Sequence, residues 1–178
     1  MTPRELEEFR ALRQTVRQRG TARVWVFLAG MIGWGALTIA TAALAALPVA
    51  TFLPLLILAI TFEAVFSLHV GVERIGRYIQ VFLEDDHGWE HVAMAMGSPL
   101  SGTGTDPLFT AHFIVAAILN VVPALLAQPV PLELGVVLGA HAIFLARLLL
   151  ARHAASRQRE ADLKRFTELR TDKEGGAA

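Results

Sequence analysis

The chain has 178 residues, enough for one domain, and its 16 Lys and Arg residues balance its 16 Asp and Glu residues. A net charge of zero gives no reason to expect nucleic acid as a partner. The sequence contains no Cys, which excludes disulfides, thiolate catalysis and cysteine-ligated metals. Hydrophobic residues make up 54% of the chain and gather in long stretches, since no Lys or Arg occurs between Arg23 and Arg74 or between Arg77 and Arg147. Stretches of this length and character predict transmembrane helices.

The first 20 residues predict an amphipathic helix outside the membrane. Thr2 and Glu5 form a capping box, and Pro3 suits the first helical position. Gly20 is expected to mark a joint between this helix and the first span.

The central region, residues 21–151, predicts a bundle of four transmembrane helices arranged as two hairpins. Prolines near the tight connections suit the turn inside each hairpin. The second helix keeps its apolar periodicity beyond the membrane edge, so we expect it to continue to about Leu83. A cytoplasmic loop at about 84–106 then joins the two hairpins. The four predicted spans are residues 24–47, 49–72, 107–126 and 132–151.

Residues 152–178 predict a cytoplasmic helical extension, which ends near Arg170 and is followed by a frayed tail. The fold class is therefore an all-α membrane protein with cytoplasmic helical extensions. Every Lys and Arg falls on one side of the membrane if both termini are cytoplasmic. Of the 16 basic residues, 14 are Arg, and with the abundant Ala this favours a GC-rich bacterial genome and hence the inner membrane.

Three ionisable residues within the predicted spans are candidates for a functional site. At about 1.5 Å per residue, Glu63 and His141 each lie roughly 17–20 Å from the outer edge, and the topology places His112 in the same layer. Asn120 lies closer to the periplasmic side. Such groups are expensive in a membrane, so they act as hydrogen-bonding polar contacts between helices, as a proton or cation pathway, or as ligands of a haem or metal.

A second cluster lies at the start of this loop, where oxygen and imidazole ligands for a divalent metal are close in sequence: Asp86, His87, Glu90 and His91. Gly88 interrupts the helix that would place both imidazoles on one face. The alternative is a helix end at the membrane surface, anchored by Trp89.

Small residues at four-residue spacing predict places where helices approach closely. Gly135 and Gly139 form a GxxxG pattern in the fourth span, and Gly33 belongs to a small-residue series in the first. These contacts serve packing inside one chain or between subunits.

The sequence carries no recognisable catalytic motif, so we do not expect an enzyme. The main expectation is a polytopic membrane protein that assembles by helix packing, either with copies of itself or as an accessory subunit of a membrane complex. Its partners would be membrane lipid and other membrane subunits. One alternative is a small ion or proton-coupled channel or transporter that uses Glu63 with His112 and His141; another is a haem- or metal-bearing redox subunit. No cofactor is predicted, although haem or a divalent metal remains open.

Overall fold

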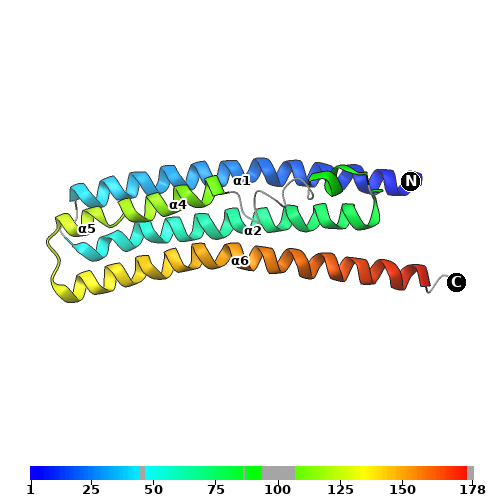
Figure 1. Ribbon diagram of the computed structural model, residues 1–178. Coiled ribbons are helices and arrows are strands. Elements are labelled where there is room, and N and C mark those ends of the chain that lie inside the picture. The colour runs from blue at the N-terminus through cyan, green and yellow to red at the C-terminus, as the bar shows by residue number, and fades with distance from the viewer. Residues whose placement is uncertain (45–46, 86, 94–106, 176–178) are drawn as a thin grey trace. The chain divides into compact units, whose positions relative to one another are not determined.

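The computed structural model of this chain describes residues 1–44, 47–85, 87–93 and 107–175. The described residues form helices and contain no strand, which confirms the predicted all-α class. The elements shown in Figure 1 are α1 (Pro3–Leu44), the 3-10 helix η1 (Pro48–Thr51), α2 (Phe52–Phe82), α4 (Pro107–Leu119), α5 (Val122–Leu126) and α6 (Pro131–Gly175).

The helix starts follow from local chemistry. The capping box before α1 is confirmed, because the Thr2 backbone N–H donates to Glu5 Oε2 at 2.6 Å and the Glu5 N–H donates to Thr2 Oγ1 at 3.3 Å. At the start of α6, the Val130 N–H donates to Glu133 Oε2 at 3.1 Å, and Pro131 occupies the first helical position.

Helix ends differ from expectation at two places. The prediction of a joint at Gly20 is wrong, because α1 runs through it without a break from Pro3 to Leu44. One glycine costs a helix only about 1 kcal/mol, which the flanking helical residues outweigh. Helix α2 ends at Phe82, close to the predicted Leu83, whereas α6 continues past Arg170 to Gly175.

The predicted third span is broken after Leu119. Pro123 has no N–H to donate to the Leu119 carbonyl four residues earlier, and its ring would clash with that carbonyl. The chain therefore turns at Asn120 and Val121 before α5 begins.

Three helical stretches are long and apolar enough to cross a membrane, namely Pro3–Ala43, Pro48–Phe82 and Pro131–Lys173. The shorter apolar stretch Thr110–Leu126 covers the remaining predicted span. The described residues thus give three candidate spans where four are predicted.

The described residues form two units. The apolar unit comprises Arg23–Phe66 and Asp106–Ala151, and the charged unit comprises Met1–Ala22, Ser67–Thr105 and Arg152–Ala178, each within the described part of the chain. Of the predicted loop at 84–106, residues 94–106 lie outside the described residues.

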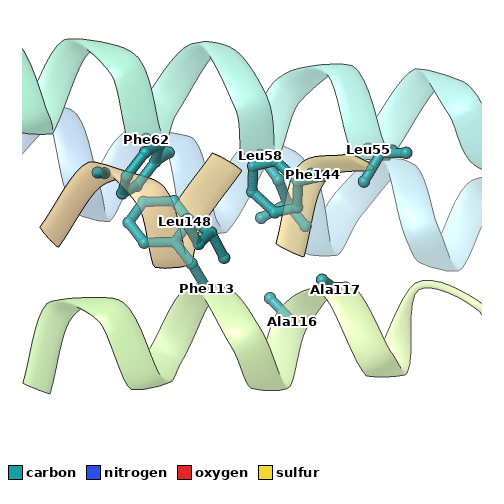
Figure 2. Packing of buried hydrophobic residues seen from close by; sticks show 9 residues of the cluster. Leu55, Leu58, Phe62, Phe113, Ala116, Ala117, Phe144 and Leu148 are labelled. Atoms are coloured by element: carbon teal, nitrogen blue, oxygen red, sulfur yellow. The ribbon is translucent and has the colours of Figure 1, made fainter. Parts of the chain in front are cut away.

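The core of the apolar unit is built by α2, α4 and α6. Phe62 of α2 meets Phe113 of α4 edge to face at 5.3 Å between ring centroids and Phe144 of α6 at 6.3 Å. Figure 2 shows the labelled side chains from the three helices gathered in the space between them. The core cluster consists of Leu55, Leu58, Phe62, Phe113, Ala116, Ala117, Phe144, Leu148 and Ala151.

The outer surface of the apolar unit is hydrophobic as well. Large aliphatic side chains more than half exposed occur on each of its long helices, including Ile32, Ile39, Leu53, Ile60, Ile118 and Ile143. A surface of this kind is suited to lipid or to another protein rather than to water.

The charged unit is held by ion pairs between helical segments. The Arg77 side chain is only 2% exposed, and its guanidinium lies 3.1 Å from Asp162 Oδ2 and 3.6 Å from Glu73 Oε2. Arg159 also pairs with Glu73, and Arg74 with Asp162 at 3.1 Å. These pairs fix which segments face each other, because removing one partner would leave the other charge uncompensated.

Burial and hydrogen bonding shift the pKa of the Asp162 carboxyl in opposite directions. Burial raises the pKa of its carboxyl, but hydrogen bonds from Gln158, Arg74 and Arg77 outweigh burial, so the pKa lies below the ordinary value of 3.8. The carboxylate is therefore held in its charged form by the surrounding donors.

An aromatic cluster packs beside these pairs. Tyr78 lies 4.8 Å from Phe82 and 5.8 Å from Phe166, measured between ring centroids, and its hydroxyl donates to Glu8 Oε1 at 2.7 Å. Burial and the hydrogen bond to Glu8 both raise the pKa of Tyr78 above its ordinary value of 10.0. The tyrosine thus joins the first helix to the second through its neutral form.

Candidate functional site

Asn120 is the centre of a buried polar network in the apolar unit. It lies at the break between α4 and α5 and is fully buried. Its amide oxygen accepts hydrogen bonds from Trp34 Nε1 at 3.2 Å and from Thr38 Oγ1 at 3.3 Å. Its amide nitrogen donates to the Thr51 carbonyl at 2.9 Å and lies 3.0 Å from His141 Nε2. Each of the four hydrogen-bonding positions of the amide therefore has a partner, and the one from Thr38 is shared, since the same hydroxyl proton also reaches the Trp34 carbonyl at 2.8 Å.

The same network assigns the tautomer of His141, which is 3% exposed. Its Nδ1 lies 2.8 Å from the Val137 carbonyl, which can only accept, so Nδ1 carries the proton. Nε2 then accepts from the Asn120 amide nitrogen. Both ring nitrogens of His141 are therefore engaged by protein atoms. We call Trp34, Thr38, Thr51, Asn120 and His141 the Asn120 network.

Glu63 forms an ion pair with Arg147. Arg147 Nε lies 2.8 Å from Glu63 Oε1, and Arg147 Nη2 donates to Glu63 Oε2 at 2.8 Å, which is the two-pronged geometry of a strong pair. The guanidinium also lies over the rings of Phe62 and Phe66, 5.7 and 5.3 Å from their centroids. The pair remains half exposed, with side-chain exposures of 49% for Glu63 and 39% for Arg147.

The sequence grouped Glu63 with His112 and His141 rather than with Arg147, which lies near the cytoplasmic end of the fourth predicted span. The pair was detectable in principle, because α2 and α6 begin at Phe52 and Pro131 and helical side chains point back toward the start of their own helix. Arg147 is 16 residues into α6 and Glu63 11 residues into α2, an offset of about 7 Å that an arginine side chain spans.

His112 is placed apart from these groups. It is exposed on α4 and meets Phe27 of α1 edge to face at 5.7 Å between ring centroids. It lines an open, apolar groove of about 560 Å³ together with Phe27, Met31, Trp34, Ala111, Val115, Ala116 and Leu119. The three ionisable residues of the predicted layer therefore have three different partners: Arg147 for Glu63, Asn120 for His141 and Phe27 for His112.

The second predicted cluster belongs to the charged unit. Asp86 lies outside the described residues. Glu90 Oε1 accepts from Arg13 Nη1 at 2.5 Å, while the other arginine nitrogen, Nη2, donates to Glu84. A short helical stretch covers residues 89–93. His87 precedes it, and His91 belongs to it. Within the described ranges, no three His, Asp or Glu side chains come together as metal ligands would.

The predicted packing glycines have different surroundings. A Cβ built on Gly33 would lie 3.8 Å from Ile57, an ordinary contact, whereas one built on Gly135 or Gly139 would meet no heavy atom within 4 Å. Among the glycines that the structure describes, the tightest approach is at Gly30, where a Cβ would lie 2.1 Å from Thr61 Oγ1. Gly30 was missed because its spacing to Gly33 is three residues rather than four.

Trp34, Thr38 and Thr51 were also missed. A signal existed for Trp34, because a buried indole N–H needs an acceptor and Asn120 is an uncharged acceptor in a predicted span. The arrangement in the apolar unit is one of saturated hydrogen bonds around Asn120 and a half-exposed ion pair. Comparison with models of known protein families, with curated proteins and with solved structures found no match for this chain.

Proposed function

We propose that the chain is a multi-pass protein of a bacterial inner membrane, with four crossings and both termini in the cytoplasm. Three helical stretches of sufficient length and apolar character support this topology. The distribution of basic residues supports it too, since none of the sixteen lies in the short turns within the hairpins. Fifteen lie outside the four predicted spans, and Arg147 lies near the cytoplasmic end of the fourth.

The remaining crossing, which is the third in chain order, would be made by α4 and α5 together. A break in a transmembrane segment is tolerated where neighbouring helices satisfy the freed backbone and side-chain groups. Asn120 at this break hydrogen-bonds to the Thr51 carbonyl and to three side chains of α1 and α6. The 20 residues from 107 to 126 match the length that one crossing requires.

Within the membrane we propose an architectural role: the protein assembles through helix packing with copies of itself, or as an accessory subunit of a membrane complex, and does not catalyse a reaction. The observation that carries this proposal is the saturation of the polar groups inside the apolar unit. The hydrogen-bonding groups of Asn120 and His141 are used to hold helices together. Polar residues between transmembrane helices are expected to have this role.

A proton or ion pathway through Glu63, His112 and His141 would need groups that exchange protons or ligands with one another. Glu63 is engaged by Arg147, and both nitrogens of His141 are engaged by protein atoms. This pattern favours the architectural role over a conducting one. It also disfavours His141 as a haem ligand, since ligation would need Nε2.

The test is native mass spectrometry of the protein extracted gently from its own membranes. A mass equal to a multiple of the chain, or a complex with other membrane subunits, is the expected result. A monomer in lipid, combined with ion or proton flux in vesicles that Glu63→Gln abolishes without unfolding the protein, would replace the architectural role by a conducting one.

A further inference from the structure

The outer surface of the apolar unit carries one ion pair at which both charges are half exposed. Glu63 and Arg147 are 49% and 39% exposed, and the guanidinium lies over the rings of Phe62 and Phe66. Facing hydrocarbon, such a pair is costly, because lipid tails offer no hydrogen bonds to the outer edges of the two groups. Something polar is needed to complete it.

Arg147 is also the last member of a ridge on α6. Gly135, Gly139, Ile143 and Arg147 follow each other at four-residue spacing, so each lies one turn beyond the previous one and about 40° further round the helix. The two glycines have open space where a side chain would be, and Ile143 is 74% exposed. The ridge is therefore free of contacts within the chain along its glycine half.

We propose that a second copy of this chain docks on the ridge Gly135–Gly139–Ile143–Arg147, with the two copies related by a two-fold axis along the membrane normal. This inference rests on the proposed membrane function and specifies its oligomeric face. Two ridges of i, i+4 residues pack at a right-handed crossing of about −40°, the angle found for GxxxG contacts.

Charge complementarity identifies the occupant. Each copy presents a carboxylate and a guanidinium at the same depth, so a two-fold axis brings Glu63 of one copy toward Arg147 of the other and the reverse. The four charges then satisfy each other in a shared cluster. An anionic lipid headgroup would pair with Arg147 but would be repelled by Glu63, which makes lipid the poorer fit.

The absence of Cys from the sequence permits a direct test by cross-linking in native membranes. Ile143→Cys places a thiol on the ridge, and Ile39→Cys places one on α1 with almost the same exposure, 72% against 74%. Disulfide formation needs Cα atoms within about 7 Å of each other, so we expect a covalent dimer from Ile143→Cys and only monomer from Ile39→Cys. Equal cross-linking of the two variants, or none at Ile143, would overturn the proposal.

A second pair of variants tests the ridge itself. Gly139→Leu adds bulk on the ridge and Gly35→Leu adds it on α1, and neither position has an atom within 4 Å of an added Cβ, so both variants should fold. In native mass spectrometry we expect loss of the dimer for Gly139→Leu and retention for Gly35→Leu. A dimer that survives Gly139→Leu, or a foreign subunit found cross-linked at Ile143, would refute docking of a second copy.

These outcomes separate the inference from the proposed function. If the protein is extracted from membranes by alkaline carbonate, the membrane function is refuted, and docking of two copies within the membrane is refuted with it. If it is an integral oligomer in which Ile143→Cys does not cross-link, the membrane function stands and the docking face lies elsewhere.

Discussion

Replacing Asn120 by Ala tests whether the buried network holds the apolar unit together. The change leaves Trp34 Nε1 without an acceptor and His141 Nε2 without a donor, and it removes the bond to the Thr51 carbonyl. Thr38 keeps an alternative partner, since its hydroxyl lies 2.8 Å from the Trp34 carbonyl. The network should therefore lose most of its bonds rather than rearrange.

The loss in free energy of unfolding caused by Asn120→Ala follows from two separate values. Hydrogen bonds between transmembrane helices average about 0.6 kcal/mol each, which gives about 2.4 kcal/mol for the four that Asn120 makes. Two buried groups left unpaired at about 1–3 kcal/mol each give about 2–6 kcal/mol, a range whose lower part agrees with the first figure. We therefore expect the free energy of unfolding to fall by about 2–3 kcal/mol.

The assay is reversible unfolding in detergent micelles, with the fluorescence of the three Trp residues as the signal. Val115→Ala on the same helix is the control, because this side chain is 56% exposed and its truncation should change the free energy by less than about 0.5 kcal/mol. If Asn120→Ala costs no more than Val115→Ala, the network contributes nothing measurable and our account of the break in the third span is wrong.

Further predictions concern the charged unit and the closest helix contact. The pKa of Asp162 is lower in the folded protein than its ordinary value of 3.8. The carboxylate therefore stabilises the fold at pH values above 3.8, and this stabilisation is lost as pH falls through the folded pKa. The free energy of unfolding of Asp162→Asn should lack this acid dependence. Tyr78 is the single Tyr of the chain, so an ultraviolet titration of the folded protein should show one phenolate transition above pH 10, which moves down toward 10 in Glu8→Gln. The stabilisation from its raised pKa is complete below pH 10 and is lost as pH rises through the folded value, so Tyr78→Phe should flatten the alkaline limb of a plot of stability against pH. Gly30→Ala should destabilise the apolar unit by about 1–3 kcal/mol through overpacking against Thr61, and Thr61→Ala in the same chain should recover part of the loss; additive effects in the double variant would contradict a direct clash.

Sequence reasoning was most accurate where the determinant is local. The capping box of Thr2 and Glu5 and the continuation of α2 to Phe82 depend on residues within a few turns, and both are present. The misplaced joint at Gly20 shows the opposite case, in which a small local cost is overridden by a long run of helix-forming neighbours.

Partners of the polar side chains were harder to predict, because they depend on rotation of each helix about its axis as well as on depth. A depth argument placed Glu63 level with His141, yet the two point toward different neighbours, Arg147 and Asn120. The break between α4 and α5 had a signal in Pro123, whose ring excludes the Leu119 carbonyl from the helical pattern. What the sequence could not reveal is that Asn120 fills the resulting gap.

The cross-helix bonds of the apolar unit carry a consequence for how the chain is made. Trp34, Thr38 and Glu63 belong to the first half of the chain, and each bonds across helices to a residue of the second half, Asn120 or Arg147. Arg147 follows Glu63 by 84 residues, which at about 5–20 residues per second takes the ribosome roughly 4–17 s.

During that interval the first hairpin holds a carboxyl group and an indole N–H that have no partner from the second hairpin. If the chain inserts as the two hairpins of the proposed topology, insertion of the first should be incomplete until the second arrives. A nascent chain stalled before residue 107 should then remain beside the insertion machinery, and the two hairpins should enter the lipid together.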